Sequence, residues 1–247
     1  MNHRKGIKKK NRHEMFSRRD FIKCTGTIIF VMGSGGYLYA EKNPGNPTKI
    51  DENGMGILPS HGYLLVDTRK CQGCMSCMLA CTLVHEGVEN PSLSRIQTIQ
   101  NSFGSYPDDV TIEQCRQCVD PACVAACPTN ALMANTEYGN VRMIDKTKCI
   151  GCGDCVEACP YTPSRPVVGS DESFNADRKG RKCDLCAVTP YHWDKAGGGP
   201  DGKQACVEVC PVGAIKFTNE MPVQEGDEGY KVNLRTKNWW KLGYPRD

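Results

Sequence analysis

The sequence predicts a small, loop-rich α+β fold whose apolar core is too thin to hold it together alone. Hydrophobic residues make up only 39% of the 247 residues and aromatic residues 7%, which is little apolar material for a chain of this length. The chain also has 17 cysteines. We therefore expect cysteine chemistry to supply the missing stabilisation.

Charge and hydropathy exclude several classes of protein. Residues 1–40 hold nine Lys or Arg and two acidic residues, so they carry +7 in a chain whose net charge is +3. The remainder is mildly acidic, and a nucleic-acid partner, which needs basic residues clustered on a folded domain, is not expected. No apolar run reaches 18 residues, which excludes a bundle of transmembrane helices. Phosphate-binding, dinucleotide-binding and hydrolase motifs are also absent, so no small-molecule substrate is expected.

The first forty residues resemble a twin-arginine export signal. A basic run precedes the pair Arg18 and Arg19, Phe21 follows two places on, and a moderately apolar stretch covers 25–40. A membrane anchor and a basic disordered arm are the alternatives, and cleavage of the leader stays open because Leu38 stands where a small residue is usual. This route carries folded proteins, so metal centres could be assembled before export. We therefore expect a periplasmic protein.

Sixteen cysteines form four groups with closely related spacings. The first and third groups follow C-x2-C-x2-C-x3-C, the second C-x2-C-x4-C-x3-C, and the fourth C-x2-C-x19-C-x3-C. A proline comes directly after the last cysteine of the second, third and fourth groups. In chain order the groups are Cys71, Cys74, Cys77 and Cys81; Cys115, Cys118, Cys123 and Cys127; Cys149, Cys152, Cys155 and Cys159; and Cys183, Cys186, Cys206 and Cys210. The remaining cysteine, Cys24, is expected to have no ligand role.

These spacings are typical of ligands to cubane [4Fe-4S] clusters. Two-residue gaps let successive thiolates converge on one compact cube, and Gly73, Gly151 and Gly153 let the backbone approach it. Structural zinc needs two separated pairs per ion, and covalent haem needs a His directly after C-x-x-C, which no pair here has. A disulfide framework is disfavoured because the cysteines of a C-x-x-C pair are poor partners for each other. Sixteen ligands are the number that four [4Fe-4S] clusters need.

Internal repeats indicate which groups belong together. Residues 66–71 resemble 144–149, so the first group opens as the third does, and residues 210–215 resemble 127–132, so the fourth closes as the second does. A hairpin with strands at 131–134 and 141–145, like that of a bacterial two-cluster ferredoxin, joins the second and third groups. The first and fourth groups then form a second module from both ends of the chain, with a strand at 214–218 paired with one at 63–67.

The predicted organisation is therefore two ferredoxin-like two-cluster modules. The fourth cysteine of each group ligates the other cluster of its module. The central sets are Cys115, Cys118 and Cys123 with Cys159, and Cys149, Cys152 and Cys155 with Cys127; the outer sets are Cys183, Cys186 and Cys206 with Cys81, and Cys71, Cys74 and Cys77 with Cys210. The predicted domains are a signal peptide at 1–40, a linker at 41–60, an outer module at 61–112 and 163–218, a central module at 113–162, and a tail at 219–247.

Over residues 62–218 the four groups resemble the iron-sulfur electron-transfer subunits of molybdopterin and tungstopterin oxidoreductases. These include the subunits of formate dehydrogenases and of dimethyl sulfoxide, tetrathionate and polysulfide reductases, and the nitrite-reductase-associated and hydrogenase-associated proteins. Because the third group is complete, the resemblance implies four [4Fe-4S] clusters. It also implies a non-catalytic subunit that lies between a molybdopterin or tungstopterin catalytic subunit and a quinone-reactive membrane subunit or multihaem cytochrome, at the outer face of the cytoplasmic membrane. The alternative is a free-standing periplasmic polyferredoxin-type electron carrier.

Residues outside the cysteine groups leave further alternatives open. The loop at 187–205 is either a docking loop or an ordinary surface loop, and the aromatic tail either anchors to a membrane subunit or packs on this same chain. The basic residues beside the ligands either raise cluster potentials or are solvated surface charges. These residues are Arg116, Lys148, Arg181 and Lys182. The histidines His61, His85 and His192 have no metal-ligand spacing and are expected to be ordinary polar residues.

Overall fold

The structure is a computed structural model that describes residues 57–106, 108–191, 199, 202–236 and 239–242. The chain divides into the units Met1–Pro44 and Gly45–Asp247, and every described residue belongs to the second. The predicted signal peptide, Cys24 and most of the predicted linker lie outside the described residues. The same holds for positions 192–198, in the middle of the loop at 187–205.

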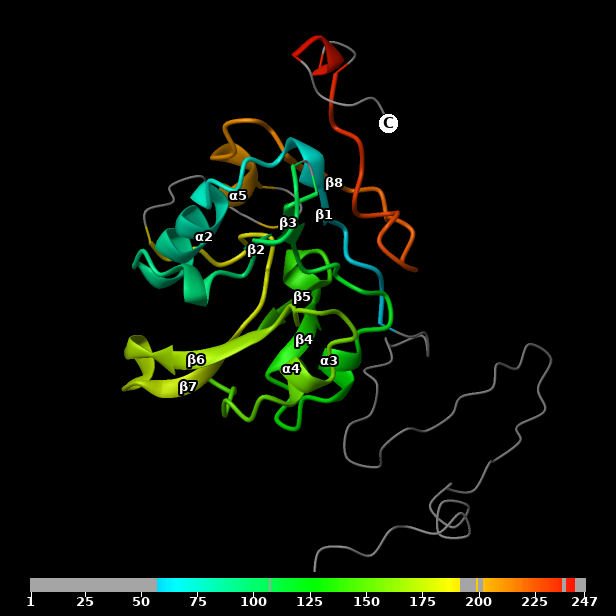
Figure 1. The fold of residues 1–247 in the computed structure, drawn as a ribbon. Coiled ribbons are helices and arrows are strands. Elements are labelled where there is room, and N and C mark those ends of the chain that lie inside the picture. Colours follow the sequence, from blue (N-terminus) through cyan, green and yellow to red (C-terminus); the bar gives the residue numbers. More distant parts are fainter. Residues whose placement is uncertain (1–56, 107, 192–198, 200–201, 237–238, 243–247) are drawn as a thin grey trace, which may run out of the picture. The chain divides into compact units, whose positions relative to one another are not determined.

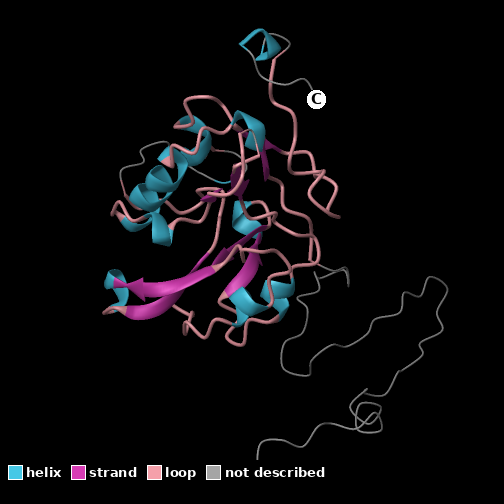
Figure 2. Ribbon diagram, viewed as in Figure 1, coloured by secondary structure: helices cyan, strands magenta, loops and turns pink. Residues whose placement is uncertain are grey.

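Short strands and short helices joined by long loops make up the described unit (Figure 1, Figure 2). The strands are β1 (Tyr63–Val66), β2 (Gln97–Gln100), β3 (Val110–Glu113), β4 (Leu132–Asn135), β5 (Val141–Ile144), β6 (Val167–Asp171), β7 (Asp177–Arg181) and β8 (Ile215–Thr218). The helices are α2 (Ser76–Glu86), α3 (Ala122–Ala125), α4 (Asp154–Glu157) and α5 (Ala205–Glu208). Short 3-10 turns lie at Thr68–Lys70, Pro91–Leu93, Thr136–Tyr138, Glu172–Phe174 and Trp239–Leu242. This agrees with the predicted α+β, loop-rich class.

Two strand pairs match the predictions from the internal repeats. Strand β1 pairs antiparallel with β8, from the other end of the sequence, so that Tyr63 lies opposite Thr218 and Val66 opposite Ile215. Strand β4 pairs antiparallel with β5 across a short 3-10 turn. Each strand lies within one residue of its predicted bounds. The β1–β8 pair closes two distant segments on each other, which positions the first and fourth cysteine groups.

Two further hairpins were not predicted. Strand β2 pairs with β3, and β6 pairs with β7, both antiparallel. The sequence of β7, Asp-Arg-Lys-Gly-Arg, has little of the β-branched and aromatic character that marks a strand, yet Gly180 and Arg181 are buried in it. The Arg181 side chain therefore points into the protein, where it meets the carboxylates of Glu86 and Asp171.

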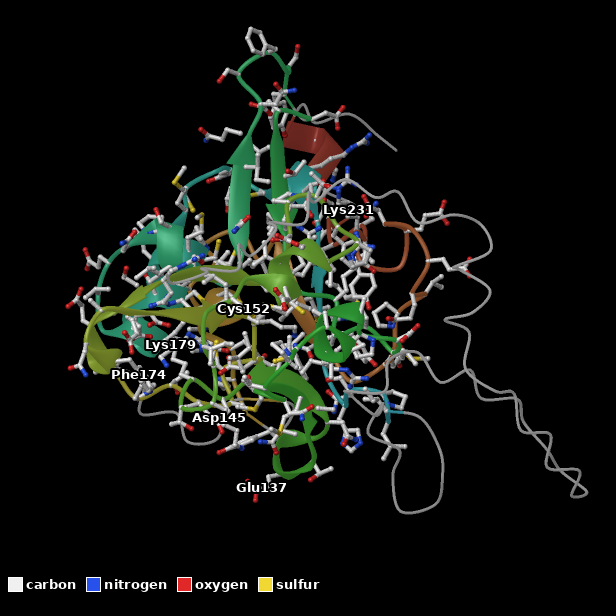
Figure 3. The ribbon with its side chains drawn as sticks, turned by 90° about the horizontal axis from the view of Figure 1, so that it is seen from below. Glu137, Asp145, Cys152, Phe174, Lys179 and Lys231 are labelled. Atoms are coloured by element: carbon white, nitrogen blue, oxygen red, sulfur yellow. The ribbon has the colours of Figure 1, made fainter. Side chains whose placement is uncertain are left out.

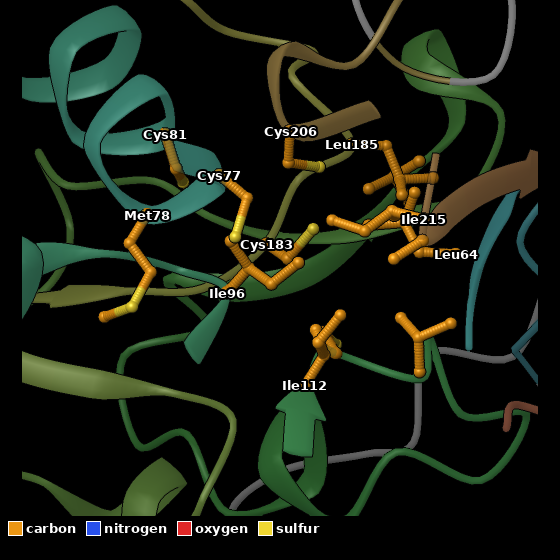
Figure 4. Close-up of a cluster of buried hydrophobic side chains, with 14 residues drawn as sticks. Leu64, Cys77, Met78, Cys81, Ile96, Ile112, Cys183, Leu185, Cys206 and Ile215 are labelled. Atoms are coloured by element: carbon orange, nitrogen blue, oxygen red, sulfur yellow. The ribbon is translucent and has the colours of Figure 1, made fainter. Parts of the chain in front are cut away.

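Cysteine side chains form a large part of the buried core. The largest cluster of buried apolar side chains includes Leu64, Ile96, Ile112, Leu185 and Ile215 (Figure 4). The cysteines packed into the same cluster are Cys77, Cys81, Cys115, Cys183 and Cys206. A second, smaller cluster combines Cys123 and Cys127 with short apolar side chains such as Ala131 and Leu132. Because sulfur atoms fill space that aliphatic groups occupy in other proteins, the core depends on what those sulfurs bind.

A buried network of charges joins the end of α2 to β7 and to the loop after β5. The Glu86 carboxylate lies 2.7 Å from Lys146, 3.2 Å from Arg181 and 3.3 Å from Arg95. Asp171, at the end of β6, lies 2.7 Å from Lys146 and 3.2 Å from Arg181. Burial acts to raise the pKa of Glu86, but the three cations outweigh it and hold the pKa below its usual value. The network connects three chain segments, because removing any one of them would leave a charge without a partner away from water.

The C-terminal segment packs on this chain's own β1. Tyr230 is fully buried, the Val66 N–H donates to the Tyr230 carbonyl at 2.9 Å, and the Val232 N–H donates to the Val66 carbonyl at 2.8 Å. Arg235 Nε donates to the Asp67 carboxylate at 3.1 Å. Of the two alternatives for the tail, packing on the same chain therefore holds for residues 230–235. Residues 237–238 and 243–247 lie outside the described part.

Replacing Glu86 by Gln should destabilise the folded unit. The change keeps the size of the side chain but leaves the buried Arg181 and the half-buried Arg95 and Lys146 with fewer partners, at a cost of about 3–5 kcal/mol. The measurement is the midpoint temperature of cluster loss, followed by visible absorbance under anaerobic conditions. Because the folded pKa of Glu86 is lowered, its stabilisation is complete above the unfolded pKa of about 4.3 and disappears as the pH falls through the folded value.

Replacing Asp108 by Asn is the matched control. Asp108 pairs with Arg69 at 3.6 Å with its side chain 73% exposed, so its loss should cost no more than about 1 kcal/mol. Equal shifts in the two variants would mean that the Glu86 network contributes no more than a surface ion pair.

Candidate metal centre

The four cysteine groups share one local geometry around their third cysteine. Cys77, Cys123, Cys155 and Cys206 are each the second residue of a helix, namely α2, α3, α4 and α5. After α3, α4 and α5 the N–H of the fourth cysteine donates to the carbonyl three residues back, at 3.2–3.4 Å. The repeated spacing of the sequence therefore corresponds to a repeated loop-and-turn unit. Helix α2 differs by continuing to Gly87, which caps it in the left-handed conformation.

Glycine is needed where the third group's loop meets β7. Gly151 has a φ of +66°, and a Cβ on it would lie 2.2 Å from the Arg178 carbonyl oxygen. No side chain fits between these two backbones. The close approach at Gly151 is thus to the backbone of β7, and the expectation that this glycine lets the backbone approach a cluster stays a prediction.

Cys71, Cys74 and Cys77 meet Cys210 from the far end of the chain. Burial raises the pKa of the Cys71 thiol, and the nearby Cys210 and Cys74 raise it further. The pKa of Cys77 is raised by burial and by the same neighbours. The β1–β8 pair brings this about, because Cys71 follows β1 closely and Cys210 precedes β8 closely.

Cys81 meets Cys183, Cys186 and Cys206. Figure 4 shows Cys81, Cys183 and Cys206 within one cluster of buried side chains. Burial raises the pKa of Cys206 well above its usual value, and Cys186, Cys183 and Cys81 raise it further. A cavity lined by all four thiols lies between them.

Cys115, Cys118 and Cys123 meet Cys159 from the third group. Burial raises the pKa of Cys123 to about 12; Lys182 opposes this, and Cys115, Cys118 and Cys159 add to it. The first three residues come from one loop and the start of α3, and Cys159 follows α4.

Cys149, Cys152 and Cys155 meet Cys127 from the second group. Burial raises the pKa of Cys155 to about 11, and Cys149, Cys127 and Cys152 contribute. These four thiols also line one cavity. Burial raises the pKa of Cys183, and Cys115 of the other predicted module raises it further, so thiols of different predicted sets also lie near each other and the ligand sets stay a prediction.

The donor set fits iron-sulfur clusters. All sixteen cysteines of the described residues are free thiols. Backbone N–H groups donate to several of the sulfurs at 3.2–3.5 Å, which favours the thiolate and influences the potential of a cluster bound to it. The accepting sulfurs are those of Cys71, Cys81, Cys115, Cys127, Cys149, Cys159, Cys186 and Cys210. Because burial raises the pKa of thiols such as Cys123, Cys155 and Cys206, binding of iron to the thiolates would release protons.

Within the described residues, no group of three or more Cys, His, Asp or Glu converges on a single metal ion. A cube of four irons is wider than one ion, so its ligands stand farther apart than those of a mononuclear site.

The thiol sets differ in their exposure. Cys74 and Cys152 are exposed, so two of the sets reach the surface. By contrast, Cys81, Cys183, Cys186 and Cys206 are all buried. Figure 3 labels Cys152, and it also labels Lys179 and Phe174, where the Lys179 Nζ lies 4.8 Å from the centre of the Phe174 ring.

The sequence left open whether four basic residues near the cysteines are solvated surface charges, and the structure shows which of them are buried. Arg116, Arg181 and Lys182 are at most 3% exposed, so they are not solvated surface charges. The Lys148 side chain is 55% exposed and pairs with Asp145 at 3.0 Å, as an ordinary surface residue does.

The expectation that His85 is an ordinary polar residue is wrong. His85 is 5% exposed; its Nδ1 lies 2.7 Å from the Cys81 carbonyl oxygen and its Nε2 lies 2.9 Å from Asp184. Burial and Arg95 act to lower its pKa, but Asp184 and Cys81 outweigh them and raise it to about 9. The sequence did contain an indication of this contact: His85 follows Cys81 by four residues, which places the two side chains on the same face of a helix.

Two family models match the chain, and both are described as 4Fe-4S dicluster domains. One covers residues 109–220 and the other residues 63–128. Two dicluster domains imply four [4Fe-4S] clusters, as the cysteine count predicts.

Several proteins are similar to this chain over most of their own length. A protein NrfC homolog of Haemophilus influenzae is 30% identical over 81% of this chain and 79% of that protein. The thiosulfate reductase electron transfer subunit PhsB of Salmonella typhi is 32% identical over 66% of this chain and 78% of that protein. The polyferredoxin-like subunit of aliphatic sulfonate oxidoreductase from Pyrococcus furiosus is 37% identical over 60% of this chain and 70% of that protein.

Among the helices of the described residues, none has the length and apolar character needed to cross a membrane.

Proposed function

Since this chain belongs to the 4Fe-4S dicluster family of iron-sulfur electron-transfer subunits of oxidoreductases, we propose that it relays single electrons through four [4Fe-4S] clusters between a catalytic subunit and a second redox partner. The observation that carries this proposal is the meeting of thiols from distant segments. In addition to burial, the nearby Cys210 raises the pKa of Cys71 and of Cys77, and the nearby Cys159 raises the pKa of Cys123. Shared ligation of this kind keeps neighbouring clusters close, as electron transfer requires.

The proposed ligand sets follow the thiol groupings. The central module holds one cluster with Cys115, Cys118, Cys123 and Cys159 and one with Cys149, Cys152, Cys155 and Cys127. The outer module, closed by β1 and β8, holds one cluster with Cys183, Cys186, Cys206 and Cys81 and one with Cys71, Cys74, Cys77 and Cys210. The protein's own contribution is to exclude water, to donate N–H groups to sulfur and to fix the spacing of the clusters.

The proposed partners are a molybdopterin or tungstopterin catalytic subunit and a quinone-reactive membrane subunit or multihaem cytochrome. The names of the relatives support a subunit role, because the thiosulfate reductase protein PhsB and the polyferredoxin-like protein are both named as subunits of reductases or oxidoreductases. We further propose that the chain is exported folded by the twin-arginine route and acts in the periplasm, beside the outer face of the cytoplasmic membrane. The Arg18-Arg19 pair supports this.

Affinity purification of the tagged full chain from its native host should recover a larger polypeptide that contains a pterin cofactor. The check is mass spectrometry of the purified complex together with pterin fluorescence and molybdenum and tungsten analysis. Recovery of a monomer alone, under conditions that preserve the clusters, would instead support a free-standing carrier.

Replacing Cys81 by Ser should disturb the cluster of Cys183, Cys186 and Cys206 and leave the Cys71 cluster intact. The reason is that Cys81 lies in the Cys71 sequence group but beside the Cys206 thiol. Electron paramagnetic resonance of the reduced protein resolves the two cases. The reciprocal variant Cys210→Ser should alter the Cys71 cluster, and loss of that cluster in Cys81→Ser would refute the crossed assignment.

Replacing Arg18 and Arg19 together by Lys should retain the cluster-bearing protein in the cytoplasm, because the twin-arginine route depends on the arginine pair. Cell fractionation with immunodetection provides the measurement. The variant Arg12→Lys, just upstream of the pair, is the control. Unchanged delivery of the double variant would contradict export by this route.

A further inference from the structure

The hydroxyl group of Tyr161 lies beside the sulfur of a proposed cluster ligand. Tyr161 Oη is 3.8 Å from Cys118 Sγ, a distance that a hydrogen bond to the large sulfur atom allows. Tyr161 follows Cys159 by two residues, so the contact joins the segment of the third cysteine group to a ligand of the second group. Within the described residues, this hydroxyl has no other hydrogen-bond partner. It is therefore a polar group whose place in the structure is defined by a cysteine sulfur.

Two buried guanidinium groups hold the Tyr161 ring. Arg116 Cζ lies 4.3 Å from the centre of the ring and Arg165 Cζ lies 5.4 Å from it, so both arginines make cation–π contacts. Each arginine is fixed in turn by a carboxylate, Arg116 by Asp227 and Arg165 by Glu113. Because the ring is held by groups that are themselves held, its hydroxyl stays beside the sulfur.

Iron binding decides which of the two groups donates the hydrogen bond. A thiol and a phenol can each donate, but a thiolate that ligates iron has lost its hydrogen and can only accept. A tyrosine hydroxyl, with an ordinary pKa of about 10, keeps its proton at neutral pH. With iron bound, the hydrogen bond therefore runs from Tyr161 Oη to Cys118 Sγ.

A second tyrosine beside the same arginine has a different hydrogen-bond partner. The centre of the Tyr230 ring lies 5.0 Å from Arg116 Cζ, but the Tyr230 hydroxyl donates to the Arg116 carbonyl oxygen at 2.6 Å. Tyr230 thus stabilises the backbone, whereas the Tyr161 hydroxyl is directed to a sulfur. The two residues allow the effect of a hydroxyl on a ligand to be separated from the effect of a hydroxyl on the fold.

We propose that the Tyr161 hydroxyl donates a hydrogen bond to the Cys118 thiolate and thereby makes the cluster that Cys118 ligates easier to reduce. Hydrogen bonds to the sulfurs are among the factors that set the potential of an iron-sulfur cluster. Reduction adds one negative charge to the cluster, which makes its sulfurs better acceptors, so the hydrogen bond is stronger in the reduced state. Tyr161 is a positioning residue, because it acts only through the sulfur.

The proposed step balances without a further reactant. One electron passes to the cluster from a neighbouring cluster or from the redox partner, no bond breaks, and the proton stays on Tyr161 Oη. The inference rests on the electron-relay function proposed above, and it names a residue that adjusts one step of that relay.

The test is a redox titration of the anaerobically purified full chain, followed by electron paramagnetic resonance. In Tyr161→Phe, the equilibrium constant for reducing the Cys118 cluster should fall about threefold to tenfold, because a hydrogen bond to a charged acceptor is stronger than one to a neutral acceptor. A tenfold change is 59 mV for one electron. Phenylalanine keeps the ring and both guanidinium contacts, so only the hydroxyl is lost. An unchanged potential, or equal shifts of all the clusters, would overturn the proposal.

Tyr230→Phe is the matched control. It also removes a hydroxyl beside Arg116, but one that donates to a carbonyl oxygen and not to a sulfur. The potential of the Cys118 cluster should therefore stay in place in this variant. A shift as large as that of Tyr161→Phe would mean that the effect comes from the fold and would overturn the proposal.

Pulsed electron paramagnetic resonance gives a second readout that a structural role would not change. The reduced Cys118 cluster should show a coupling to a proton that disappears in D2O, and this coupling should be absent in Tyr161→Phe and present in Tyr230→Phe. Identical exchangeable couplings in the unaltered protein and in Tyr161→Phe would refute the hydrogen bond.

The variant Cys118→Ser separates failure of the inference from failure of the proposed function. The cluster signal that this variant alters identifies the cluster to be followed in the titration. If iron and sulfide content and all cluster signals are unaltered in Cys118→Ser, Cys118 is no ligand, and the proposed ligation fails together with the inference. If Cys118→Ser alters one cluster but Tyr161→Phe leaves its potential unchanged, the inference alone is refuted.

Discussion

Ligation of iron by buried thiolates is the interaction on which the rest of this structure depends. The five cysteines of the main core cluster stand beside Leu64, Ile96 and Ile112, where other proteins of this size place more aliphatic side chains. A buried thiol with a raised pKa stays protonated unless a metal binds its sulfur. The clusters therefore act both as the electron carriers and as the centres around which the short strands and one-turn helices are arranged, which explains how so little regular structure forms a defined fold.

The sequence predicted those parts of the fold that repeat within it. The β4–β5 hairpin and the β1–β8 pair were accessible because similar residues surround similar cysteines. The β6–β7 hairpin was not accessible, since its strand character depends on Arg181 meeting Glu86 and Asp171 far away in the sequence. For the same reason no local pattern distinguished the buried Lys182 from the exposed Lys148.

Buried charge is distributed unevenly along the cysteine groups. Beside α2, the carboxylates of Glu86, Asp171 and Asp184 offset the arginines and lysines of β7 and the neighbouring loops. At β5, Arg142 has no such carboxylate among the described residues, and its Nε and Nη2 are buried without a hydrogen-bond partner. Since all these groups are removed from water, their fields act at short range with little screening.

The pairing of β1 with β8 also has a consequence for biosynthesis. Strand β1 leaves the ribosome early, but its partner, together with Cys210, is translated only after both central cysteine groups. The Cys115 and Cys149 groups can therefore receive their inorganic cores on a nascent chain, while the Cys71 group waits for the carboxyl-terminal quarter. Maturation of this protein is expected to proceed from the middle of the polypeptide outward, and a truncated product would retain only half of its iron.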